Sequence, residues 1–110
     1  MEPSNAFGIG ISPIDDIQGN IQSRVGEFLT ARQKLTTIVN TTQDLSIKEE
    51  AIGLLGSQGY LENQLIEVNN TIQRIKTDSY SISDIVAVGS FYAQMEKHLY
   101  DVNDLYEKYV

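Results

Sequence analysis

The residue best suited to acid–base or metal chemistry in this chain is its single histidine, His98. Asp101 follows three residues later, which places both side chains on one face if the segment is helical. A protein metal site normally gathers more ligands than this pair on one face. General acid–base catalysis would also need a partner group and a pocket. We therefore interpret His98 as a surface histidine and assign no catalytic or metal-binding residue.

The carboxylates and glycines offer no other recognisable chemistry. Di-iron bundles use Glu-x-x-His on facing helices, and the sequence contains no such motif. The glycine-rich stretch 53–59 has no lysine directly after it and no strand pattern before it, so it does not match a phosphate-binding loop. Cysteine is absent, which removes thiolate metal sites and cysteine nucleophiles. We predict that the protein is not an enzyme and that it uses no cofactor.

Charge and hydropathy narrow the classes of partner. The chain carries 8 basic and 15 acidic side chains, for a net charge of −7. Binding to nucleic acid or to anionic lipid needs clustered Lys and Arg, so both are disfavoured. No apolar stretch approaches the ~20 residues of a membrane span. The first residues include neither a basic region nor a long apolar run, so we expect no signal peptide and an intracellular or particle-associated location.

Three segments position these side chains. In each, apolar residues recur at alternating steps of three and four, the spacing of one helix face. They predict helices at 13–40, 47–77 and 83–109. Ser46 with Glu49 would form a capping box for the second helix, and Ser81 or Ser83 would cap the third. We predict an all-α fold over residues 12–110, with three long antiparallel helices in an elongated bundle or coiled-coil-like hairpin.

The middle of the second helix is the weakest part of this pattern. Gln58 is a polar residue in the apolar seam, and Gly53, Gly56 and Gly59 surround it. Three glycines cost about 3 kcal/mol of helix propensity. Because the seam keeps its register through them, we favour a continuous or kinked helix over a loop. Gly56, Gln58 and Gly59 mark a candidate interface, where glycines would let another backbone approach.

The N-terminal residues 1–11 form a second candidate interface. Pro, Ser, Asn and Gly in this stretch disfavour a helix, so we expect a flexible, extended arm. Phe7, Ile9 and Ile11 alternate with glycines, which places the three side chains on one face of an extended segment. The arm is either a disordered tail or a segment that lies along a partner subunit.

Tyrosines near the C-terminus form the third candidate interface. Tyr106 and Tyr109 continue the seam of the third helix, whereas Tyr100 points elsewhere. Tyrosine tolerates partly wet packing and is common at interfaces. These rings either close the end of the bundle or contribute to a subunit contact.

A structural role is the function that these features favour. We expect a non-catalytic structural or assembly subunit of a larger complex, such as a virion, phage tail or secretion apparatus. Its partners would be other proteins or copies of itself, with no direct nucleic acid and no small-molecule substrate. The alternative is a small acidic helical binder or inhibitor that occupies a basic groove on a partner. Acids clustered on one face would favour that alternative, but the sequence spreads them over all three helices.

Overall fold

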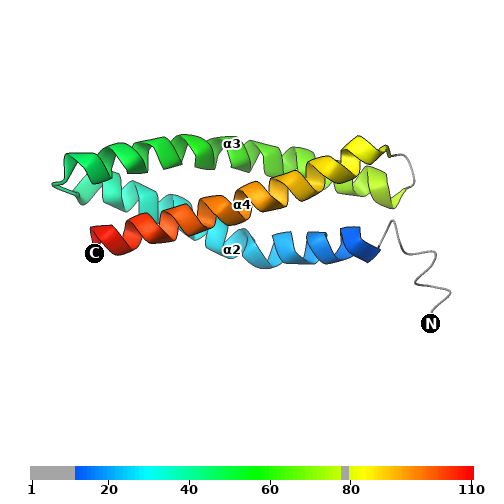
Figure 1. The fold of residues 1–110 in the computed structure, drawn as a ribbon, viewed down its shortest axis with the longest axis horizontal. Coiled ribbons are helices and arrows are strands. Elements are labelled where there is room, and N and C mark those ends of the chain that lie inside the picture. The colour runs from blue at the N-terminus through cyan, green and yellow to red at the C-terminus, as the bar shows by residue number, and fades with distance from the viewer. Residues whose placement is uncertain (1–11, 78–79) are drawn as a thin grey trace.

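The described part of the chain folds into three helices that pack as a rod (Figure 1). The computed structural model describes residues 12–77 and 80–110. It contains α2 (Ser12–Thr41), α3 (Leu45–Lys76) and α4 (Ile82–Tyr109), with no strand in these ranges. The helix α3 runs antiparallel to α2 and α4, and the principal extents are 58 × 24 × 17 Å. The predicted all-α, elongated bundle is confirmed, whereas the expected arm with Phe7, Ile9 and Ile11 lies outside the described residues.

The predicted seams form the core. Each helix packs against both of the others, so its buried stripe faces two neighbours. Fully burying one such aliphatic or aromatic side chain is worth about 1.5–3 kcal/mol, and packing of this kind supplies most of a helix's stability. Fully buried apolar side chains come from every helix: Ile21, Phe28 and Leu35 from α2, Ile72 and Ile75 from α3, and Val88, Met95 and Val102 from α4.

The helix α3 continues without a break through its glycines, as the unbroken seam predicts. An added Cβ at Gly53 or Gly56 would meet no atom within 4 Å, and one at Gly59 would meet only the Arg32 guanidinium, at 3.8 Å. Packing inside the bundle therefore does not require glycine at these positions. Burial of the apolar stripe on the opposite side of α3 offsets the lower helix propensity of these glycines.

The start of α3 differs from the expected capping box at Ser46. The N-cap is Asp44, whose Oδ1 accepts hydrogen bonds from the backbone N–H groups of Ser46 at 2.9 Å and Ile47 at 3.1 Å. One carboxylate thus satisfies two free N–H groups, and its negative charge suits the positive end of the helix. Ser46 lies inside the first turn as a result.

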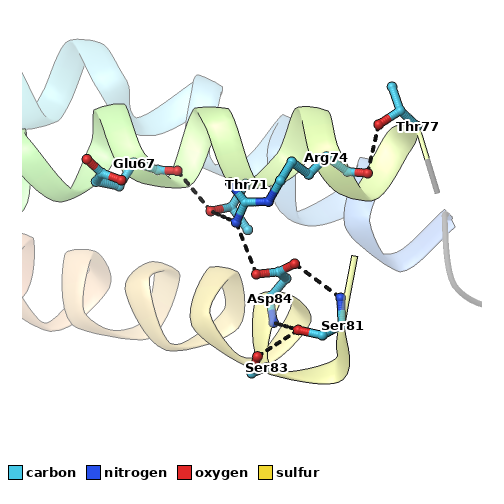
Figure 2. A network of polar contacts seen from close by, with 7 residues as sticks. All are labelled: Glu67, Thr71, Arg74, Thr77, Ser81, Ser83 and Asp84. Atoms are coloured by element: carbon cyan, nitrogen blue, oxygen red, sulfur yellow. Dashed lines mark hydrogen bonds and ion pairs between the residues drawn. The ribbon is translucent and has the colours of Figure 1, made fainter. Parts of the chain in front are cut away.

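One carboxylate has two roles where the end of α3 meets the start of α4 (Figure 2). Ser81 caps α4 as predicted: its Oγ accepts from the Asp84 N–H, and Asp84 Oδ2 accepts from the Ser81 N–H at 3.1 Å. Asp84 Oδ1 also accepts from Arg74 of α3 at 3.1 Å. The Ser81 backbone bond, followed by Arg74, lowers the pKa of Asp84. The cap of α4 therefore also fixes its position on α3.

Candidate functional site

Two polar side chains lie inside the core, Gln58 of α3 and His98 of α4, with 0% and 4% of their surface exposed. His98 Nε2 and Gln58 Oε1 are 2.7 Å apart. Gln58 Nε2 donates to the backbone carbonyl of Phe28 in α2 at 2.8 Å. Because the amide nitrogen donates to a carbonyl, the amide oxygen faces His98, and His98 Nε2 is the donor in their bond. A single amide therefore joins all three helices.

The cluster extends outward to an ion pair between α2 and α3. Gln58 Nε2 also donates to Glu62 Oε2 at 3.0 Å. Glu62 in turn accepts two bonds from Arg32, from Nε at 2.8 Å and from Nη2 at 2.7 Å. The bond from Arg32 is the largest cause that lowers the pKa of Glu62. Arg32, Glu62, Gln58 and His98 form a continuous chain of hydrogen bonds, the polar cluster, from the surface to the core.

The interpretation of His98 as a surface residue is wrong. In a three-helix bundle the buried stripe on each helix faces two neighbours, so it includes residues beside the seam, and His98 precedes the seam residue Leu99. Burial lowers the pKa of His98, against the opposing effects of Asp101 and Glu62. The imidazole is therefore neutral at pH 7. Its ring borders a hollow of about 240 Å³ between α3 and α4 that Ser57, Lys97 and Asp101 also line.

The polar cluster is suited to specifying structure. Hydrogen bonds join its four side chains in sequence, and each neutral hydrogen bond contributes about 0.5–1.5 kcal/mol net. Breaking the pairing by a shift of one helix would leave buried polar atoms without partners. Buried polar links of this kind can fix which helix faces meet and in which register. Within the described ranges, no three His, Cys, Asp or Glu side chains are grouped as a metal site would need.

The second polar residue in the seams, Arg24, lies between α2 and α4. It is half-buried and forms an ion pair with Glu96 at 2.9 Å. Further along the same interface, Lys34 Nζ donates to Asn103 at 3.1 Å and lies 5.0 Å from the centre of the Tyr106 ring. These contacts connect the middle of α2 to the second half of α4.

The structure separates the three residues of the mid-chain candidate interface. Gln58 is fully buried, so in this fold it is a core residue and offers no surface. Gly56 is exposed, and Gly59 is half-buried beside Arg32. The glycines remain accessible at the surface of α3, whereas the polar residue between them points into the bundle.

The three C-terminal tyrosines also take different positions. Tyr106 and Tyr109 are half-buried against the core, with ring centres 5.9 Å apart. The hydroxyl of Tyr109 hydrogen-bonds Thr41 at the end of α2. Tyr100, by contrast, is 72% exposed. Two rings therefore close the end of the bundle, and the third is free of the core.

A further surface was missed from the sequence. Leu29 of α2 and Ile52 and Ile66 of α3 are 54%, 52% and 62% exposed. Leu29 lies one turn before Arg32, and Ile66 lies one turn after Glu62. Because α2 and α3 run antiparallel, both lie on the same side of the Arg32–Glu62 ion pair along the rod. We define the α2/α3 face by the residues Leu29, Leu45, Ile52, Gly59 and Ile66. The sequence contains a pattern that marks this face, because Leu45, Ile52, Gly59 and Ile66 recur at intervals of seven residues.

Acidic groups gather on other sides of the rod. A hollow of about 390 Å³ between α3 and α4 is lined by Glu50, Asp101 and Asp104, together with Gly53, Leu54 and Ser57. On the α2/α3 face, by contrast, Arg32 and Glu62 neutralise each other. The molecule therefore has an acidic groove along α4 and an apolar face between α2 and α3.

No family model, curated protein or solved structure matches this chain. In the parts of the chain that the structure describes, no helix is both long enough and apolar enough to span a bilayer.

Proposed function

We propose that this chain is a non-catalytic subunit of a larger protein assembly and that it binds protein through the α2/α3 face. The observation that carries the proposal is the exposure of Leu29, Ile52 and Ile66 around a neutralised ion pair. A virion, a phage tail and a secretion apparatus are examples of assemblies that use rod-shaped helical subunits of this kind.

The spacing and size of the apolar face favour a protein partner. Single exposed aliphatic residues are ordinary on protein surfaces. Apolar residues at seven-residue intervals on one face are instead typical of a helix that packs against another helix. Each of Leu29, Ile52 and Ile66 has about half of its surface left to bury. Covering the three would contribute about 3 kcal/mol, at about 1 kcal/mol each.

The polar cluster supports a structural role for the one histidine. Its Nε2 donates to Gln58, and the same amide bonds Phe28 of α2. The chemistry of the imidazole is thus used to join helices. A subunit that binds by helix packing needs its helices held rigidly, and the hydrogen bonds of Gln58 to His98 and Phe28 hold the three helices together.

Site-specific photo-crosslinking tests the proposal. A photo-reactive phenylalanine analogue would replace either Ile66 of α3 or Val86 of α4, which are both 62% exposed. The full chain would be illuminated in the cells or particles that produce it. We expect discrete crosslinked proteins from position 66 and few from position 86. Equal yields at the two positions, or none at 66, would refute binding through this face.

The acidic binder is the second candidate, and the groove with Glu50, Asp101 and Asp104 is the observation that favours it. Basic side chains of a partner would complement these carboxylates. The same photo-crosslinker at Ser57, which lines the groove, would report such a partner. Crosslinks at 57 that are absent at 66 would favour the binder over the assembly subunit.

A further inference from the structure

The α2/α3 face is self-complementary, and we infer that its occupant is a second copy of this chain. In this pairing the two α3 helices run antiparallel and cross at Gly59. The inference rests on the proposed function and names the partner. Three properties of the face support it: the spacing of its apolar residues, the placement of its charges and its size.

The apolar spacing is symmetric about Gly59. Ile52 and Ile66 lie seven residues before and after it, so a two-fold axis at Gly59 places Ile52 of one copy opposite Ile66 of the other. A strict seven-residue repeat is the spacing at which two helices stay in contact along a left-handed crossing. Glycine at the axis presents no side chain to the second copy, and the group beside it is the Arg32 guanidinium, 3.8 Å from where a Cβ would lie.

The charges favour the antiparallel direction. Lys48 lies three residues after Leu45 and four before Ile52, so it shares their side of α3. Antiparallel pairing about Gly59 sets Lys48 opposite Asn70 and Glu62 opposite Gly56. Parallel pairing would instead place Lys48 and Glu62 each at the same level as its own copy, and like charges at the same level of an interface repel.

The charges also favour a second copy over a basic partner. Each copy has a net charge of −7, so two copies repel unless they meet where the charge is balanced. Arg32 and Glu62 are paired on the α2/α3 face, whereas Glu50, Asp101 and Asp104 line the groove beside α4. A basic partner would gain little at the balanced face and more at the acidic groove.

The face is large enough for a stable dimer. With Leu45 of one copy opposite Gln73 of the other, the contact spans about 42 Å of α3 at 1.5 Å per residue. Two helices packed 8–10 Å apart present a surface about 20 Å wide, which agrees with the 24 Å extent of the rod. This length multiplied by this width gives a contact area of about 800 Å² on each copy, which is the size of a standard stable interface.

Disulfide trapping tests the direction of pairing, because the chain has no cysteine of its own. Ile52→Cys and Ile66→Cys proteins, each with a distinct mass tag, would be oxidised alone and as a mixture. We expect the mixed 52–66 dimer to exceed both self-crosslinked dimers. A Val86→Cys protein serves as the exposed control on α4 and should remain uncrosslinked. Dominant 52–52 and 66–66 products would overturn the antiparallel pairing.

Sedimentation equilibrium tests the pairing itself. We expect a concentration-dependent dimer whose dissociation constant rises at least tenfold in Ile66→Glu and less than twofold in the matched Val86→Glu. Unchanged ellipticity at 222 nm would show that both variants fold. A wild-type chain that stays monomeric up to about 1 mM, or equal weakening by both variants, would overturn the inference. If photo-crosslinking at 66 then captures only a different protein, self-pairing fails while the proposed function stands; an absence of crosslinks there removes both.

Discussion

Replacing Gln58 by leucine should destabilise the protein because it leaves His98 without its partner. The change removes the 2.7 Å bond to His98 and the 2.8 Å bond to the Phe28 carbonyl. Phe28 lies within α2, so its carbonyl keeps its helical bond, and Glu62 keeps Arg32. The uncompensated group is the buried Nε2–H of His98, which costs about 1–3 kcal/mol. Since leucine gains some apolar burial, we expect Gln58→Leu to lose about 1–2 kcal/mol of unfolding free energy.

A double-mutant cycle shows whether the two side chains act as a pair. His98→Leu should cost a similar amount, because it strands the Gln58 amide oxygen. The double variant Gln58→Leu/His98→Leu replaces both partners by apolar groups of similar size, which is close to neutral. The coupling energy should then be about 2–4 kcal/mol, at the upper end of the range for contacting residues.

Urea unfolding followed by ellipticity at 222 nm measures the cycle. The four proteins would be compared at pH 8 and at one concentration, because self-association would make stability depend on concentration. The unfolding free energy of all four proteins must depend on urea concentration with the same slope before the urea midpoints are converted to differences in free energy. A loss of 1 kcal/mol corresponds to about 4–8 °C in melting temperature for a domain of this size. Additive losses, with coupling below about 0.5 kcal/mol, would refute the role given to this pair.

Two further predictions concern pH and helix α3. Burial lowers the pKa of folded His98 below its usual 6.5, so as pH falls the histidine is protonated in the unfolded chain before it is protonated in the folded protein. The free energy of unfolding is therefore unaffected by this group above about pH 6.5 and declines as pH falls toward the pKa of the folded state. The loss in urea midpoint between pH 7.5 and 5.5 should be smaller in His98→Leu than in the wild type, and equal losses would contradict this cause. Gly56→Ala should raise stability by about 0.5–1 kcal/mol, because the position is exposed, helical and open to a Cβ. A lower melting temperature for Gly56→Ala would show that α3 is not a regular helix there.

The fold was predictable because its main determinant is periodic. The apolar seams predicted the three helices within about two residues, and the register on both sides of Gly56 favoured a continuous or kinked α3 over a loop. Helix ends depend on a choice between neighbouring side chains, and the spacing of Ser46 and Glu49 predicted a capping box at Ser46, whereas the N-cap is Asp44. The structure shows why Asp44 is preferred: its carboxylate reaches two N–H groups at once. For α4 the sequence left Ser81 and Ser83 as alternatives, and the structure selects Ser81, whose capping box Asp84 completes.

The polar cluster was harder to predict because the position of each member depends on a partner on another helix. Gln58 alone suggested an interface, and His98 alone suggested the surface. A polar residue in phase with a seam implies a polar partner on a facing helix, and His98 lies beside Leu99 in the third seam. Which residue of α4 faces Gln58 depends on how the helices are offset along the rod. That offset follows from three-dimensional packing, which periodicity does not specify.

The up–down–up order of the helices also determines how the rod would carry a mechanical load. With three helices, the start of α2 and the end of α4 lie at opposite ends of the rod (Figure 1). Side-chain contacts span each end: Lys76 pairs with Asp15 at one, and Tyr109 with Thr41 at the other. A pull between residues 12 and 110 would therefore act along the helix axes and shear many lateral contacts at once. A hairpin of two helices, pulled at adjacent ends, would instead separate one contact at a time.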